Sequence, residues 1–268
     1  MNNQLSLFAT CPKGVEDLLA TECKHSHLKD IRPSHGGVYC RGDLSAAYHL
    51  CLWSRTASRV LLQLARFDVS DHDDLYNGVQ AISWPEHVSA SGSLAIDCNS
   101  SHKVINNSHY AMLKVKDAII DQFQSQLERR PNIERNRPDI RINVYIDRDS
   151  CSVYLDLSGE PLHMRGYRQQ AGAAPLKENL AAAILLRSNW PALAAEGRPL
   201  IDPLCGSATL LLEAAYIATD KAPGLLRDYY GFSSWKQHDA AIWNRLHHEA
   251  EQKSEAGKKQ VPALIGIE

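Results

Sequence analysis

The 268-residue sequence contains no apolar run long enough to cross a membrane. Its longest uninterrupted apolar stretch, Leu180 to Leu186, is far shorter than the roughly 18 residues that a spanning helix needs. The first twenty residues include Lys13, Glu16 and Asp17 and lack the apolar core of a secretory signal. We therefore expect a protein that neither crosses a membrane nor is exported.

Paired cysteines are also missing. The seven cysteines are an odd number and no two stand at C-x-x-C spacing, so neither a disulfide framework nor a thiolate zinc site is expected. The histidine clusters His25/His27 and His247/His248 lack a partner Cys or acid pair at ligand spacing. The sequence predicts no metal site and a reducing, cytoplasmic location.

Charge of one sign is not in excess either. With 29 Lys and Arg against 31 Asp and Glu, the formal net charge is −2. Such a balance argues against a protein that coats nucleic acid by bulk electrostatics and leaves room for a local basic surface. The dinucleotide fingerprint GxGxxG and the P-loop are both absent. The absence of the fingerprint disfavours a dinucleotide-dependent oxidoreductase.

The apolar periodicity predicts an α/β protein with three parts. Residues 1–70 read as strand, helix, strand, strand, helix and strand, the order of a ferredoxin-like subdomain. Residues 71–158 read as a second small module, with a helix over 110–127 and a hairpin over 139–157. Glycines and prolines over 159–175 indicate a linker. Residues 176–268 begin a doubly wound domain, in which a helix, a short strand at 199–202 and a second helix at 209–218 follow one another.

The most informative segment is Asp202 to Thr209, with the sequence DPLCGSAT. A strand that delivers an acid at its carboxyl end, followed by small residues and a helix, leaves backbone N–H groups facing a crevice, which favours an anionic group of a nucleotide. An ordinary helix start capped by Ser207 or Thr209, with Cys205 packed in the core, explains the fragment equally well.

The surrounding segments favour the first interpretation. DPLCGSAT resembles the D-P-x-C-G-S-G-T cofactor loop of S-adenosylmethionine-dependent RNA methyltransferases, and LHMRGYR (162–168) and APLKENLAA (174–182) resemble the segment that precedes it. Together with the amino-terminal pattern, nearly the whole chain resembles the RlmL-type large-subunit rRNA guanine-N2 methyltransferases. This resemblance implies a ferredoxin-like subdomain and a THUMP domain followed by an incomplete Rossmann-like methyltransferase domain.

The resemblance also implies a cofactor, S-adenosyl-L-methionine, and residues that bind it. Asp202 and the loop that follows would contact its methionine part, Pro175 and Leu176 would form the pocket wall, and Glu268 would accept hydrogen bonds from the ribose hydroxyls. Ala208 stands where the family has glycine, so a positive φ there would cost about 1 kcal/mol. The candidate cofactor residues are Pro175, Leu176, Asp202, Leu204, Cys205, Gly206, Ser207, Ala208, Thr209 and Glu268.

The family's catalytic loop, N/D-P-P-aromatic, does not occur in the sequence. We therefore expect no catalytic residue in these 268 residues, which would be an inactive amino-terminal portion of a longer enzyme, loosely held from about residue 200 onward. Whether a second methyltransferase domain follows stays open. The alternative is a non-catalytic THUMP-type RNA-binding protein with a vestigial methyltransferase tail.

The expected partner is 23S rRNA or a large-subunit assembly intermediate, and two runs supply local positive charge. Residues 127–141 hold five Arg against three acids, and residues 161–177 hold two Arg and one Lys without an acid. Such charge suits phosphate contact, although a solvated loop is an equally good explanation for any single arginine. The RNA-binding candidates are Lys114, Lys116, Arg129, Arg130, Arg135, Arg137, Arg165 and Arg168.

Overall fold

The structure is a computed structural model that describes residues 4–168, 175–257 and 261–267. Its chain divides into two compact units. The first comprises residues 1–60, 161–228 and 239–268, and the second comprises residues 61–160 and 229–238. Within the described ranges, no helix combines the length and the apolar character needed to cross a bilayer.

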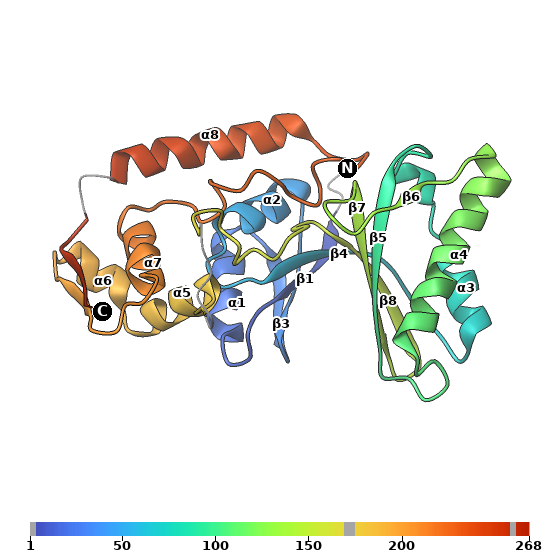
Figure 1. The fold of residues 1–268 in the computed structure, drawn as a ribbon, viewed down its shortest axis with the longest axis horizontal. Helices are drawn as coiled ribbons and strands as arrows, with labels where there is room; N and C mark the ends of the chain where they lie inside the picture. Colours follow the sequence, from blue (N-terminus) through green and yellow to red (C-terminus); the bar gives the residue numbers. More distant parts are fainter. Residues whose placement is uncertain (1–3, 169–174, 258–260, 268) are drawn as a thin grey trace. The chain divides into compact units, whose positions relative to one another are not determined.

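The amino-terminal elements follow the predicted ferredoxin-like order along the chain (Figure 1). In the first unit, β3 pairs antiparallel with both β1 and β2. The side chain of Asp43 caps α2, since its Oδ1 accepts the Ala46 N–H at 2.8 Å. The elements are β1 (Leu5–Thr10), α1 (Glu16–His25), β2 (Lys29–Ser34), β3 (Gly37–Gly42), α2 (Leu44–Trp53) and β4 (Arg59–Asp68).

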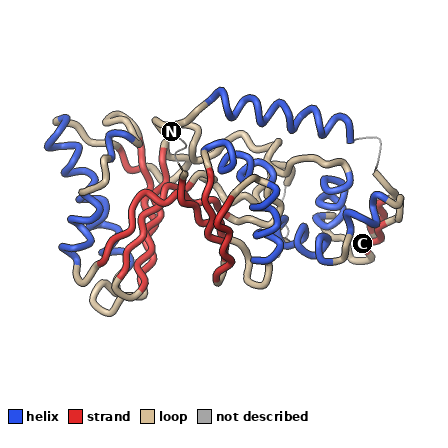
Figure 2. The backbone as a smooth tube through the Cα atoms, turned by 180° about the vertical axis from the view of Figure 1, so that it is seen from behind, coloured by secondary structure: helices blue, strands red, loops and turns tan. Residues whose placement is uncertain are grey.

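The second unit is a sheet with its helices on one face (Figure 2). The strand order is β4-β8-β7-β5-β6, with β7 antiparallel to β8 and parallel to β5. The predicted hairpin is confirmed. The elements are α3 (His72–Gln80), the 3-10 helix η1 (Trp84–Glu86), β5 (Ser93–Ser100), α4 (Ser108–Leu127), β6 (Asn132–Ile133), β7 (Ile140–Asp147) and β8 (Ser150–Asp156).

Helix α4 exposes one apolar side chain and buries a polar one. Leu127 is 47% exposed, whereas Gln122, five residues earlier in the helix, is buried. The Gln122 side chain is fully used, because its amide donates to the Gln80 and Ile82 carbonyls and its carbonyl accepts the Trp84 N–H. A buried polar side chain is tolerated when such partners exist.

The rest of the first unit holds the predicted start of a doubly wound domain. The short strands β9 and β10 pair in parallel, and α5, α6 and α7 pack around Trp190 and Ala214. The elements are α5 (Glu178–Arg187), α6 (Trp190–Ala195), β9 (Leu200–Asp202), α7 (Thr209–Ala218), α8 (Ala240–Gly257) and β10 (Leu264–Gly266). The predicted bounds of α7 agree with the structure, and α8 was missed.

Candidate cofactor site and RNA-contact residues

The loop between β9 and α7 is fixed to the neighbouring strand. Asp202 pairs in register with Gly266, and its carbonyl accepts the Ile267 N–H at 2.9 Å. The Ile267 carbonyl in turn accepts the Cys205 N–H at 3.0 Å. A Cβ on Gly266 would come within 2.9 Å of Cys205 Sγ. Glycine therefore allows the loop to lie against β10.

The turn into α7 uses left-handed backbone at two positions. Gly206 has φ +46° and Ala208 has φ 56° and ψ 26°. Ala208 thus has the positive φ at which an alanine Cβ is strained by roughly 1 kcal/mol. Among the described residues no side chain caps α7, so its first-turn N–H groups remain available to an acceptor.

Arg168 joins the start of α7 to the segment before α5. Its Nη2 donates to Thr209 Oγ1 at 3.0 Å and to the Leu176 carbonyl at 2.9 Å, and its Nε donates to Glu178 Oε1 at 2.9 Å. Thr209 and Glu178 are each 4% exposed. One guanidinium thus holds two predicted cofactor-binding residues, Leu176 and Thr209, at a fixed separation.

The residues of this loop fit an anionic, nucleotide-like group. The space around Gly206 is open, because apart from its two chain neighbours no atom of the residues that the structure describes lies within 4 Å of a Cβ built there. The Nη1 of Arg168 is buried and has no hydrogen-bond partner among the residues that the structure describes. A buried orphan donor beside an uncapped helix start is complementary to a ligand with acceptor oxygens.

The remaining predicted cofactor residues occupy different surroundings. Pro175 and Ser207 are exposed, and Leu204 is 88% exposed. Asp202 is half-buried, with its Oδ1 accepting the Leu204 N–H. Glu268 lies outside the described residues.

Two of the predicted RNA-binding arginines are engaged inside the protein. Arg165 is 2% exposed, with Nε 3.4 Å from Glu213 Oε1 and Nη2 donating to the Arg55 carbonyl at 2.6 Å. Because a buried guanidinium cannot reach a phosphate, the prediction for Arg165 is wrong. Arg168, with a 19% exposed side chain, makes the contacts described above, so its direct RNA role is also withdrawn.

The other RNA-binding candidates lie on the second unit. Arg129, Arg130 and Arg135 are exposed. Arg137 is also exposed and pairs with Glu160 at 3.2 Å. Two lysines of α4 have acidic neighbours, since Lys114 lies 3.9 Å from Asp73 and Lys116 lies 3.3 Å from Asp117. The two lysine side chains are only 29% and 32% exposed, and their carboxylate partners face solvent, so these pairs contribute little stability.

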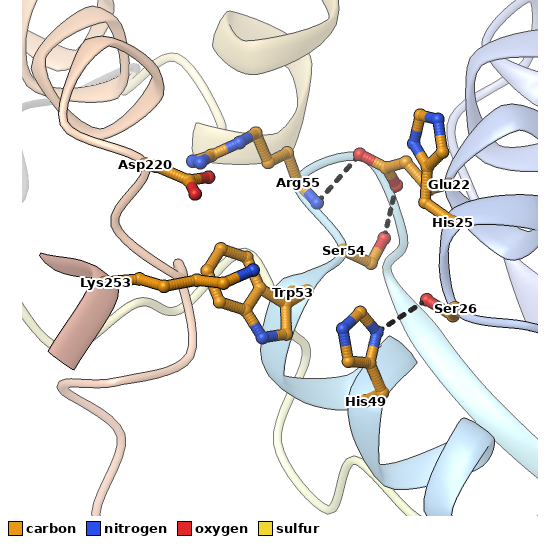
Figure 3. Close-up of a pocket in the computed structure, with 9 residues that line it drawn as sticks. All are labelled: Glu22, His25, Ser26, His49, Trp53, Ser54, Arg55, Asp220 and Lys253. Carbon is orange, nitrogen blue, oxygen red and sulfur yellow. Dashed lines mark hydrogen bonds between the residues drawn. The ribbon is translucent and has the colours of Figure 1, made fainter. Parts of the chain in front are cut away.

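A separate pocket of about 290 Å³ is lined by α1, α2 and α8 and by Asp220 (Figure 3). The Glu22 carboxylate accepts hydrogen bonds from Ser54 Oγ and the Arg55 N–H, and Lys253 Nζ lies 4.8 Å from the centroid of the Trp53 ring. Because two cations face two carboxylates, the charge of this pocket favours no ligand class.

Sequence reasoning missed the buried network behind α7. Besides Arg165, Glu213 Oε1 accepts the Tyr167 hydroxyl at 3.0 Å, and the Arg55 guanidinium donates to the Tyr216 and Lys221 carbonyls. A glutamate on the otherwise apolar face of a helix is the available signal, because it requires a buried cation. No group of three or more His, Cys, Asp or Glu side chains in the described part of the chain is arranged to hold a metal.

Three family models match successive parts of the chain. The RlmL ferredoxin-like domain matches residues 6–61, the THUMP domain matches residues 69–156, and the RMKL-like methyltransferase domain matches residues 165–268. The chain therefore carries an RlmL ferredoxin-like domain, a THUMP domain and an RMKL-like methyltransferase domain in succession. The loop from Asp202 to Thr209 lies inside the methyltransferase match.

Individual relatives extend this result to the whole chain. The ribosomal RNA large subunit methyltransferase K/L of Syntrophotalea carbinolica is 50% identical over 268 residues, which cover 100% of this chain and 38% of the relative. The chain thus spans well under half the length of that relative.

Solved structures agree in fold. A predicted N6-adenine-specific DNA methylase from Listeria monocytogenes superposes with a TM-score of 0.86 at 29% identity, covering 98% of this chain and 67% of that one. SMU.472, solved in complex with SAH, superposes with a TM-score of 0.83 at 28% identity, covering 100% and 76%.

Proposed function

We propose that the chain is the RNA-binding and cofactor-binding portion of a methyltransferase that uses S-adenosyl-L-methionine to methylate large-subunit rRNA. The carrying observation is the β9–α7 loop, whose uncapped helix start and orphan Arg168 donor suit a cofactor with acceptor groups. The name of the Syntrophotalea relative and the SAH in the SMU.472 structure support rRNA as substrate and this cofactor class.

In this proposal the cofactor lies between the loop and the segment before α5. Asp202 and the backbone over 204–209 contact its methionine part, Pro175 and Leu176 form a wall, and Glu268 accepts from the ribose hydroxyls. When bound, the cofactor supplies an electrophilic methyl group on sulfur. The residues of this chain orient it and leave the methyl group open to the nucleic acid.

The reacting atom we propose is the exocyclic N2 of a guanine in 23S rRNA, within the ribosome or an assembly intermediate. Holding that base requires an N/D-P-P-aromatic loop, which the sequence does not contain. These 268 residues alone would therefore bind cofactor and RNA without turnover. The proposed domain limits are 1–70, 71–158, 159–175 and 176–268. The proposed location is a reducing cytoplasm, because the seven cysteines are free.

Calorimetric titration of the chain with S-adenosylhomocysteine, and separately with NAD, tests the cofactor assignment. We expect saturable 1:1 binding of S-adenosylhomocysteine and none of NAD.

RNA binding without cofactor binding would instead favour a non-catalytic THUMP-type protein with a vestigial tail. Robust methyl transfer by the chain alone would refute the inactivity proposal, and a DNA substrate in the same assay would check the N6-adenine DNA methylation predicted for the Listeria protein.

Contact with RNA is proposed for Lys114, Lys116 and the arginines over 129–137. Charge reversal at Arg129, Arg130, Arg135 and Arg137 together should weaken binding to a 23S rRNA transcript and flatten its salt dependence, because each lost phosphate contact reduces the slope by about one. The matched control reverses Arg198, an exposed arginine outside this set. Unchanged affinity at low salt would place the interface elsewhere.

A further inference from the structure

The guanidinium of Arg168 has more donors than partners. Arginine carries five N–H donors in a planar fork. In this protein Nε serves Glu178 and the two N–H groups of Nη2 serve Leu176 and Thr209, whereas the two on Nη1 are buried and unpartnered among the described residues. Burying a donor without an acceptor is unfavourable, so Nη1 is suited to a ligand.

The position of the fork restricts that ligand to the proposed cofactor site. Nη1 and Nη2 share one planar group, and Nη2 lies 3.0 Å from Thr209 Oγ1, which in turn lies 3.2 Å from Ser207 Oγ in the loop. The Leu176 carbonyl on the other side belongs to the proposed pocket wall. The free Nη1 donors therefore belong to a guanidinium that lies between the two proposed cofactor-binding segments, the loop at Ser207 and Thr209 and the pocket wall at Leu176.

The chemistry favours an anionic oxygen acceptor. A guanidinium edge matches a carboxylate, and hydrogen bonds to charged partners are the stronger ones. The Glu178 carboxylate already bonds to Nε, so it holds the fork in place while the Nη1 edge faces away from that contact. The proposed cofactor carries one carboxylate, on its methionine part.

We propose that Arg168 is a cofactor-binding residue whose Nη1 donates to the carboxylate of S-adenosylmethionine. This assignment rests on the proposed function. It replaces the RNA-binding role predicted from the sequence, and it makes the carboxylate a determinant of cofactor specificity.

The test compares two ligands, one with and one without the amino-acid end that carries the carboxylate. S-adenosylhomocysteine has the amino-acid carboxylate, and 5′-methylthioadenosine keeps the adenosine and the sulfur but lacks the amino-acid end. Dissociation constants are measured by calorimetry for the unchanged chain, Arg168→Gln, Arg168→Lys and the exposed control Arg198→Gln. We expect Arg168→Gln to weaken S-adenosylhomocysteine at least 10-fold and methylthioadenosine less than 3-fold. The control should change neither.

Arg168→Lys separates a contact from a packing role. Lysine keeps a cation but cannot donate to Leu176, Glu178 and Thr209 together. We therefore expect an intermediate loss of affinity that still falls mainly on S-adenosylhomocysteine. If Arg168→Gln fails to fold, the Arg168→Lys variant provides the test. Thr209→Val, which removes one of the two Nη2 acceptors and the hydrogen bond with Ser207 Oγ, should weaken both ligands alike. Equal losses on the two ligands in both Arg168 variants, or no loss, would overturn the inference. Absence of binding by the unchanged chain would instead overturn the proposed function.

Discussion

The sheet of the second unit and the β9–β10 pair bury their apolar side chains to very different extents. On β7, the side chains of Ile140, Ile142 and Ile146 are 0% exposed. On β9 and β10, Ile201 and Ile265 are 56% and 44% exposed. Stability from apolar burial scales with the area removed from water, so the second unit is the more strongly held region and β9–β10 should open locally at lower free energy.

The largest expected effect contrasts a core residue with an exposed one. Trp84 is 0% exposed and donates its indole N–H to the Val79 carbonyl. Trp84→Ala should lower the free energy of unfolding by about 3–5 kcal/mol, whereas Leu204→Ala, at an 88% exposed position, should change it by less than about 0.5 kcal/mol. Urea unfolding measures both. Similar losses would remove the contrast between the two regions.

The next effect tests how much the buried ion pair between Arg165 and Glu213 of α7 contributes to the free energy of unfolding, in contrast to the exposed β9–β10 pair. Glu213→Ala leaves Arg165 as a buried cation without its carboxylate and should cost about 3 kcal/mol. Glu196→Ala, which removes an exposed partner of Arg198, is the matched control and should cost less than about 1 kcal/mol. A small loss at Glu213 would mean that water replaces the carboxylate.

A smaller effect of opposite sign is expected in the β9–α7 loop. Ala208→Gly removes a Cβ from left-handed backbone and should stabilise the protein by about 1 kcal/mol. Ala192→Gly, at an exposed position inside α6, should instead destabilise it by a similar amount. Thermal unfolding of the two variants compares them. If both lower the midpoint, the positive φ at Ala208 carries no strain.

The smallest effect depends on pH and compares one histidine from each unit. Burial, and then the charges of His27 and Lys253, lowers the pKa of His49 to about 4 from its ordinary 6.5. Burial also lowers the pKa of His87, whose Nδ1 accepts the Trp235 indole N–H.

The direction of this pH effect follows from the neutral form being favoured in the folded state. Each histidine contributes stability that is fully present above pH 6.5 and is lost as pH falls toward the folded pKa, about 4 for His49. His49→Gln and His87→Gln should each lose less stability than the unchanged chain between pH 7 and pH 5. Parallel pH profiles in all three proteins would contradict this account.

The sequence predicted local structure better than it predicted the partners of charged side chains. The bounds of α7 and the hairpin of β7 and β8 follow from nearby residues. Helix α8 was missed because Arg, His and Glu obscure a narrow apolar face at Leu246 and Ala250. Arg165 was misassigned because its burial depends on Glu213, which lies distant along the chain and becomes a neighbour only in the folded protein.

The same distinction applies to the proposed cofactor site. The motif from Asp202 to Thr209 and the replacement of the family's glycine by Ala208 could be identified from the residues and their family resemblance, whereas the positive φ of Ala208 is known only from the structure. The hydrogen bonds of Arg168 to Leu176, Glu178 and Thr209 could not be predicted from the sequence, because only tertiary packing determines the orientation of the guanidinium.

The most direct test of the central claim is an amide NMR titration of the 268-residue chain with S-adenosylhomocysteine. If the β9–α7 loop is the cofactor site, the saturable shifts will concentrate at Gly206, Ser207 and Thr209 and at the Nε–H of Arg168. Saturable shifts confined to the second unit, or none at any ligand concentration, would contradict it.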